Sequence, residues 1–162
     1  MIILLSFYAG LRACEIAGLA WPMVLGSDHK IDDAATLGGG ITKGGRMRSV
    51  PLAPKLRTSL RQLHRVSSRP VEGPVILSER NRHMTPRSIV NWFALTYREL
   101  GLSGCSSHSG RRTFITRTAR LVSKTGGSLR DVQELAGHRA LTTTERYIEG
   151  DRAAQRKLIA LL

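Results

Sequence analysis

Near its C-terminus the chain reads Leu135-Ala136-Gly137-His138-Arg139-Ala140-Leu141-Thr142-Thr143-Thr144-Glu145-Arg146-Tyr147. Gly137 predicts the end of one short helix, and the segment from Thr142 to Glu145 has the pattern of a capping box that opens the next. A histidine after a helix end and a tyrosine nine residues later are, taken alone, most often packed or capping residues. Their meaning therefore depends on the residues that accompany them elsewhere in the chain.

The composition favours a single domain with a polyanionic partner. The chain has 162 residues, of which 41% are hydrophobic, which is enough for one packed core and leaves little room for a second domain. Its formal net charge is +13 and its pI is about 11.2. Because arginine and lysine side chains bind phosphate groups, nucleic acid is the simplest partner. A merely soluble basic surface, or a structural protein bound to ribosomal RNA, is also compatible with the charge.

The cysteine content supports neither a disulfide framework nor a zinc site. The two cysteines, Cys14 and Cys105, lack the close spacing of metal-binding pairs, so we expect each to be a small core residue. No metal or other cofactor is predicted. The N-terminal run from Met1 to Leu5 is apolar, but it is far shorter than the roughly 20 residues of a membrane span and has no basic segment. We therefore expect a core helix there and a cytoplasmic protein.

Apolar spacing and capping residues predict a mainly helical chain. Glycine clusters in residues 24–52 separate short β-branched pieces, such as Ile41-Thr42 and Ser49-Val50, which indicates short antiparallel strands with tight turns. The expected fold class is α+β, mainly helical, with a small antiparallel β-sheet of about three strands. Helices are expected at residues 2–9, 11–19, 54–66, 86–100, 109–124, 129–136 and 151–162, and the capping box at Thr142 opens a further helix that carries Tyr147.

Two short motifs each contain an arginine placed to bind a phosphate. His108 and Arg111 lie three residues apart at the expected start of a helix, so they share one face beside free backbone N–H groups that favour an anion. Arg12 is followed one helical turn later by Glu15, a carboxylate that can hold its guanidinium rigid. Taken alone, the first pair is more often incidental, and the second is more often a weak surface ion pair.

Lys43 lies in the segment Thr42-Lys43-Gly44-Gly45-Arg46, the expected turn between two strands. A hairpin tip of this kind can reach into a DNA groove, although a solvated lysine is the default for such a turn. The segment does not match a phosphate-binding P-loop. A tyrosine must lose a proton with a pKa near 10 to act as a nucleophile, so Tyr147 needs a base or a strongly positive site. Two arginines, a lysine and two histidines supply such a site.

Together these segments resemble the catalytic domain of the tyrosine recombinases, also called phage integrases. The resemblance covers the chain from Leu4 to Ile148, with four motifs in the family's order. Each motif alone is weak, but four in register are a specific signal. They are the first-arginine motif Gly10-Leu11-Arg12-Ala13-Cys14-Glu15-Ile16, the lysine hairpin from Thr42 to Leu52, the motif His108-Ser109-Gly110-Arg111-Arg112-Thr113-Phe114, and the tyrosine motif from Leu135 to Tyr147.

The resemblance implies site-specific DNA recombination, as in integration or excision by a mobile element or prophage. Tyr147 would attack a phosphodiester of double-stranded DNA and form a 3′-phosphotyrosyl bond. That covalent intermediate conserves the bond energy, so strands are exchanged without ATP or metal. Arg12 and Arg111 would clamp the non-bridging oxygens and stabilise the charge of the transition state, with Glu15 supporting Arg12.

The remaining site residues also take their roles from the resemblance. Lys43 would protonate the 5′-oxygen leaving group, His108 would assist proton transfer at the tyrosine, and His138 would hydrogen-bond the phosphate. Arg46 and Arg48 would hold the backbone of the duplex, which contributes affinity rather than sequence readout.

The chain departs from the family's pattern in two ways. Gly110 and Arg112 stand where the family commonly has leucine and histidine; a glycine near a helix start costs under about 1 kcal/mol, so we expect the fold to survive. We expect residues 1–162 to form the catalytic domain without the N-terminal core-binding domain that is usual in the family, which should weaken DNA binding. The expected C-terminal helix, residues 151–162, either joins protomers into a tetramer or packs on its own protomer.

Two other functions are weighed against recombination. A type IB topoisomerase shares the chemistry but relaxes supercoils without exchanging partners, and the small size and the motifs at Arg12 and His138 favour the recombinase. A truncated, non-catalytic integrase remnant would only bind DNA. The complete set of six catalytic residues favours the enzyme, whereas the missing domain favours the remnant.

Overall fold

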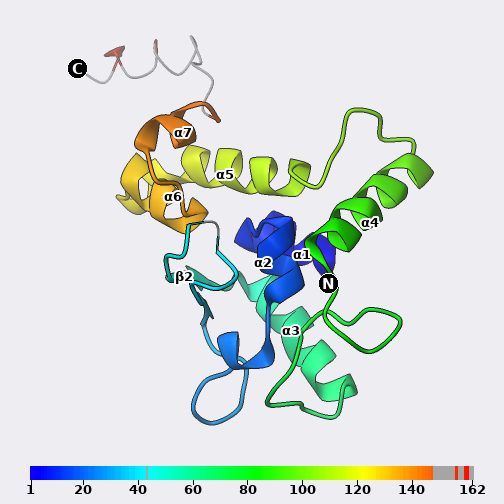
Figure 1. Cartoon of the computed structure of the whole chain (residues 1–162). Helices are drawn as coiled ribbons and strands as arrows, with labels where there is room; N and C mark the ends of the chain where they lie inside the picture. The colour runs from blue at the N-terminus through cyan, green and yellow to red at the C-terminus, as the bar shows by residue number, and fades with distance from the viewer. Residues whose placement is uncertain (43, 148–155, 157–158, 161–162) are drawn as a thin grey trace.

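The computed structural model describes residues 1–42, 44–147, 156 and 159–160, and this part is mainly helical with a small antiparallel sheet (Figure 1). The expected α+β class is confirmed. No helix in the described ranges is long and apolar enough to cross a membrane. The elements in chain order are α1 (Ile2–Ala9), α2 (Ala13–Gly18), the 3-10 helix η1 (Trp21–Met23), β1 (Ala34–Leu37), β2 (Arg48–Pro51), α3 (Pro54–Val66), α4 (Pro86–Glu99), α5 (Ser109–Leu121), the 3-10 helix η2 (Val122–Thr125), α6 (Leu129–Ala136) and α7 (Leu141–Glu145).

Two hydrophobic clusters hold these elements together. The larger cluster joins α1, α2, α3, α4 and the sheet, and the smaller one consists of Ile115, Val132 and Ala136 with the partly buried apolar side chains around them. Figure 1 shows α1 and α2 at the centre, α5 crossing above them, and α6 and α7 at one end of α5. The seam between the clusters therefore runs between α1 and α2 on one side and α5 and α6 on the other.

Local sequence signals place most of the helices. The helices α1 and α3 have the bounds expected from the sequence, and α6 begins at the expected capping box, in which the backbone N–H of Ser128 donates to Oδ2 of Asp131 at 2.7 Å. The expected core helix at the N-terminus is confirmed. Cys14 is only half-buried and Cys105 is exposed, so the expectation that both cysteines lie in the core is wrong.

The second expected capping box is not formed. Helix α7 begins after Ala140, which makes no side-chain cap bond, and Tyr147 lies in the turn that follows the helix rather than within it. Thr144, inside the expected box, is buried and its hydroxyl is hydrogen-bonded to His138 Nδ1 at 2.9 Å. The side chain amide of Gln133 also binds the carbonyl oxygens of residues 138 and 139, which fixes the chain before α7. Because α7 begins at Leu141, Thr142 lies inside its first turn and does not cap it.

Strands β1 and β2 pair antiparallel, with Leu37 opposite Arg48. The described part holds two strands and some isolated bridges, where about three strands were expected. The pair Ile41-Thr42 lies in the loop of residues 38–47 instead of in a strand. The hydroxyl of Thr42 donates to the carbonyl oxygen of Arg46 at 2.7 Å, so this loop closes on itself rather than extending the ladder.

Glycine allows α1 and α5 to pack at very short range. A Cβ atom on Gly110 would lie 2.4 Å from Oγ of Ser6 and 2.7 Å from the ring of Phe7, both in α1. Gly10 ends α1 in the left-handed conformation, with φ of 62°, and lies against Phe114 of α5. The departure at Gly110 therefore has a packing reason, and the close approach brings the end of α1 next to Arg111.

We expect Gly110→Ala to lower the free energy of unfolding by about 1 to 2 kcal/mol, because the added methyl group overpacks the contact between α1 and α5. Gly40→Ala is the control, since Gly40 is exposed and an added Cβ there meets no atom within 4 Å. Urea unfolding of both variants measures the difference. A Gly110→Ala protein as stable as the wild type would show that α5 moves away without cost.

Candidate active site

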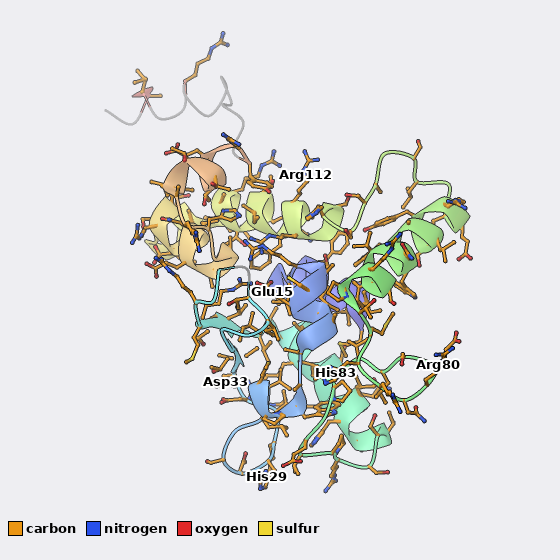
Figure 2. The ribbon with its side chains drawn as sticks, in the orientation of Figure 1. Glu15, His29, Asp33, Arg80, His83 and Arg112 are labelled. Atoms are coloured by element: carbon orange, nitrogen blue, oxygen red, sulfur yellow. The ribbon has the colours of Figure 1, made fainter. Side chains whose placement is uncertain are left out.

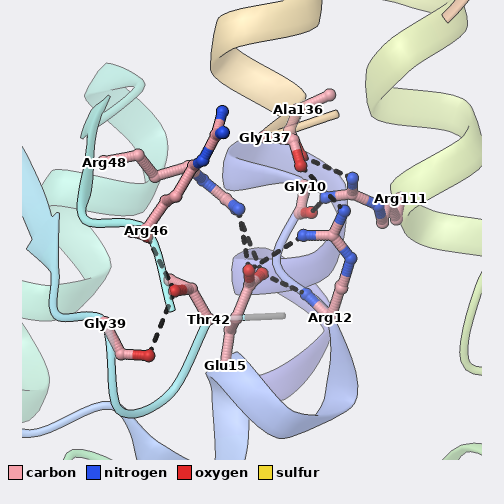
Figure 3. Close-up of polar contacts among 10 residues, drawn as sticks. All are labelled: Gly10, Arg12, Glu15, Gly39, Thr42, Arg46, Arg48, Arg111, Ala136 and Gly137. Atoms are coloured by element: carbon pink, nitrogen blue, oxygen red, sulfur yellow. Dashed lines mark hydrogen bonds and ion pairs between the residues drawn. The ribbon is translucent and has the colours of Figure 1, made fainter. Parts of the chain in front are cut away.

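Arg111 is a buried cation on the seam between the two clusters. Its side chain comes from the first turn of α5 and is 4% exposed. Nη1 donates to the carbonyl oxygen of Gly10 and Nη2 to that of Ala136, both at 2.5 Å (Figure 3). Burial, with the positive charges of Arg12 and Arg48, lowers its pKa to about 10, so it stays protonated at neutral pH. One guanidinium thus joins the ends of α1 and α6 to α5.

Arg12 is held beside Arg111 by the buried carboxylate of Glu15. Oε2 of Glu15 accepts the backbone N–H of Arg12 at 2.8 Å, and Oε1 accepts Nη1 of its side chain at 3.0 Å. Nη2 of Arg12 donates to the carbonyl oxygen of Gly137 at 3.2 Å. The carboxylate of Glu15 is 0% exposed, so this ion pair is not a solvent-exposed surface pair.

Arg48 is the residue whose position the sequence did not reveal. Its guanidinium binds Glu15 through both nitrogens, with Nη1 2.7 Å from Oε1 and Nη2 3.0 Å from Oε2. This placement differs from the expectation that Arg48 lies on the backbone of a duplex. Arg46, two residues earlier, is exposed. No local signal separates the two arginines in the sequence, because the partner of Arg48 lies 33 residues away.

These groups form a preassembled positive centre (Figure 3). Three guanidinium groups and one carboxylate carry a net charge of +2 together. A guanidinium has five N–H donors, and the bonds within the described ranges engage two groups in Arg12 and two in Arg111. Donors are therefore left on both arginines for an anion of tetrahedral or trigonal shape.

His138 and Tyr147 lie together beside this centre. Their rings are stacked, with centroids 5.8 Å apart and planes inclined by 19°. Burial first, and then the positive charges of Arg111, Arg12 and Arg48, together lower the pKa of His138 to about 4, so the ring is neutral at pH 7. Its Nδ1 is hydrogen-bonded to the hydroxyl of Thr144, which leaves Nε2 for another partner.

Tyr147 is half-buried and its body packs against the smaller hydrophobic cluster. The hydroxyl of Thr116 on α5 donates to the carbonyl oxygen of Tyr147 at 3.3 Å. The backbone N–H of Tyr147 donates to the carbonyl oxygen of Thr144 at 3.0 Å. The turn after α7 is thereby fixed to α5. A tyrosine so held is oriented by the same helix that carries Arg111.

The other predicted residues lie around this centre or outside the described ranges. His108 is exposed at the N-cap of α5. Lys43 and most of the expected helix at 151–162 fall outside the described residues. Figure 2 shows Glu15 at the centre of the ribbon and Arg112 projecting outward from α5. The loop before β2 and helix α6 line an open pocket of about 720 Å³, whose lining includes Arg46, Arg48 and His138.

The chain belongs to the phage integrase family, because the model of that family, described as "Phage integrase family", matches residues 1–153. Among curated proteins it is similar to the tyrosine recombinase XerC of Azotobacter vinelandii, with 30% identity over 149 residues. That match covers 91% of this chain and 46% of XerC. The chain thus spans about half the length of the curated relatives it matches.

Solved structures show the same fold. The integrase from mycobacterium phage Brujita superposes with a TM-score of 0.62 and 29% identity, over 96% of this chain and 47% of that one. The XerH site-specific recombinase, solved bound to its difH substrate in a pre-cleavage complex, gives a TM-score of 0.69 at 20% identity, over 98% of this chain and 45% of that one. These matches confirm the fold expected from the four sequence motifs.

The low pKa of His138 makes stability depend on pH. Between about pH 6.5 and pH 4 the unfolded chain takes up a proton at His138 that the folded chain does not, so this contribution to stability falls as the pH falls. We expect the wild type to lose on the order of 1 kcal/mol more than His138→Gln between pH 7 and pH 5, after allowing for the partial exposure of the ring. Urea unfolding at the two pH values measures it. Equal losses would mean that His138 has an ordinary pKa.

Proposed function

We propose that residues 1–162 form the catalytic domain of a site-specific DNA recombinase that cleaves and rejoins strands through a 3′-phosphotyrosyl intermediate. The observation that carries the proposal is the convergence of Arg12, Arg111 and His138 from three distant segments, with Tyr147 stacked on His138. A phosphate bound to the two guanidinium groups lies next to the tyrosine ring in this arrangement. Membership of the phage integrase family supports the same chemistry.

The charge of the site suits the transition state of phosphoryl transfer. A phosphodiester carries one negative charge and gains negative charge on its non-bridging oxygens as the tyrosine attacks. The fixed charge of +2 from the arginine and glutamate groups is already in place, so little reorganisation is needed when that charge develops. Neutral His138 donates from Nε2 to a non-bridging oxygen if Nδ1 accepts from Thr144, and it adds no repulsion to the arginines.

The proton transfers follow from the bonds that change. Oη of Tyr147 forms a bond to phosphorus and loses its proton, while the bond from phosphorus to the 5′-oxygen breaks and that oxygen gains a proton. His108, exposed at the N-cap of α5, would assist the loss from the tyrosine. Lys43 would supply the proton to the 5′-oxygen; its neighbour Gly44 lies against the side chain of Arg139, next to His138 in the chain. Rejoining reverses both transfers.

The partner that we propose is double-stranded DNA. The net charge of +13 and the exposed Arg46 in the lining of the pocket favour a polyanion, and the related XerH was solved on its DNA substrate. We also propose that four copies assemble on DNA, joined by residues 151–162, and that the protein acts in the cytoplasm. Gel filtration of the complex with DNA tests the assembly.

Tyr147→Phe should abolish covalent attachment to DNA and leave reversible binding intact, because the variant loses only the nucleophilic hydroxyl. The protein is mixed with nicked duplexes from the DNA that flanks its gene, and the products are separated on a denaturing gel. Cleavage beside the nick releases a short fragment, and its loss prevents rejoining and so traps the covalent adduct. A wild-type adduct absent in Tyr147→Phe supports the proposal. Binding without any wild-type adduct would favour a DNA-binding role alone.

Lys43→Ala should slow cleavage of ordinary DNA by about 10²- to 10⁴-fold, because a poor alkoxide leaving group then departs without its acid. A duplex with sulfur in place of the bridging 5′-oxygen should be cleaved at nearly the wild-type rate, since a thiol with a pKa near 8.5 leaves without protonation. Single-turnover rates on both substrates measure this. Tyr147→Phe is the control, expected to be inactive on both; a Lys43→Ala defect that sulfur leaves unchanged would assign the acid to another group.

A further inference from the structure

Arg48 is a largely buried cation on a hairpin whose neighbouring cation, Arg46, is exposed. It is the first residue of β2, and its side chain is 10% exposed. The exposed Arg46 has the same charge and lies two residues away. Proximity in sequence therefore does not make the two arginines equivalent, and only Arg46 presents its charge to a partner at the surface.

We propose that Arg48 is a positioning residue that couples the Lys43 hairpin to Arg12 through the carboxylate of Glu15. The proposal rests on the recombinase function proposed above and deepens it. Arg48 touches neither DNA nor the reacting atoms in this assignment. It sets where the hairpin stands relative to the arginine that holds the phosphate.

The carboxylate of Glu15 binds Arg12 and Arg48 at the same time. Oε1 accepts Nη1 of Arg12 at 3.0 Å and Nη1 of Arg48 at 2.7 Å. Oε2 accepts the backbone N–H of Arg12 at 2.8 Å and Nη2 of Arg48 at 3.0 Å. Each oxygen thus has one bond to each arginine. A shift of Arg48 would leave both oxygens half-satisfied in a fully buried place, so Arg12 would have to move as well.

The pairing of β1 with β2 fixes the position of Arg48 along the hairpin. Arg48 lies opposite Leu37, which is 0% exposed, and Val50 on the same strand is also 0% exposed. A slip of β2 by one residue would turn the buried Val50 outward and remove Arg48 from its place opposite Leu37, so the strand register is fixed by the core. The loop of residues 38–47, which contains the Lys43 position, is therefore attached at a strand end that is itself bound to Glu15.

The hairpin also contacts the tyrosine motif, residues 135–147. A Cβ atom on Gly137 would lie 2.4 Å from Nη1 of Arg48, so this guanidinium packs directly on the backbone whose carbonyl oxygen binds Arg12. At the loop tip, a Cβ atom on Gly44 would lie 2.6 Å from Nη2 of Arg139. The hairpin thus meets the segment around His138 at two points, one at the loop tip and one at the start of β2.

The test compares Arg48→Gln with Arg46→Gln, two variants that remove the same charge from one hairpin. We expect Arg48→Gln to lower the single-turnover cleavage rate at saturating protein by about 10- to 100-fold, because a misplacement of about 1 Å is enough for such a loss. Its DNA affinity and the salt dependence of binding should be unchanged. Arg46→Gln should weaken binding and reduce the salt slope by about one. Arg61→Gln, an exposed change on α3, is the control for both readouts.

Two readouts separate positioning from loss of folding. In a Glu15→Gln background the further change Arg48→Gln should cost little, because the coupling has already been removed. Sulfur at the 5′-bridging position should restore part of the rate of Arg48→Gln, since the misplaced group is the acid on the hairpin. If Arg48→Gln does not fold, Arg48→Lys keeps the charge but not the bidentate fork, and should show the same rescue with a smaller defect.

The outcomes distinguish the two proposals. A wild-type rate in Arg48→Gln and Arg48→Lys, or a loss of affinity with a smaller salt slope, would overturn the positioning role and place Arg48 on DNA. Additive effects with Glu15→Gln, or no rescue by sulfur, would also overturn it. A wild-type chain that binds nicked duplexes but never forms the adduct would instead reject the proposed function.

Discussion

The buried carboxylate of Glu15 is the constraint on which the site depends. A charge with no exposure to solvent is tolerated only when its hydrogen bonds are satisfied, and here Arg12 and Arg48 satisfy both oxygens. Removing one partner of such a group typically costs about 3 to 5 kcal/mol, because the remaining charge is left buried and unpaired. The strand β2 and the helix α2 are therefore held in one arrangement by electrostatics as well as by packing.

The seam between the hydrophobic clusters explains why a polar site forms in the interior. The larger cluster fixes α1, α2 and the sheet, and the smaller one fixes α5 and α6. Where they meet, the chain ends of α1 and α6 present carbonyl oxygens, and Arg111 and Arg12 bind them. Because Gly110 lets α1 approach α5 closely, the oxygen of Gly10 comes within reach of Arg111. Helix packing thus determines the positions of the cations.

Local sequence signals predicted much of the fold, although not every helix start and strand. Gly10, Pro54 and the capping box at Ser128 act within a few residues of themselves, so the bounds of α1, α3 and α6 could be read from the sequence. The expected box at Thr142 failed because α7 begins earlier, at Leu141, so Thr142 lies inside the first turn instead of at the N-cap. The expected strand at Ile41 failed because the loop closes through Thr42.

The amino-acid order alone sufficed to identify the reactive groups, namely the arginines, the histidines and the tyrosine, because residue identities and spacings do not depend on the folded structure. The tertiary structure alone decided which of them act together. Arg48 and Arg46 look equivalent in the sequence, yet one is buried on Glu15 and the other is exposed. The low pKa of His138 likewise comes from burial and from arginines of three other segments. Burial and charge proximity act across space, and only the packed chain brings residues separated by up to 125 positions into contact.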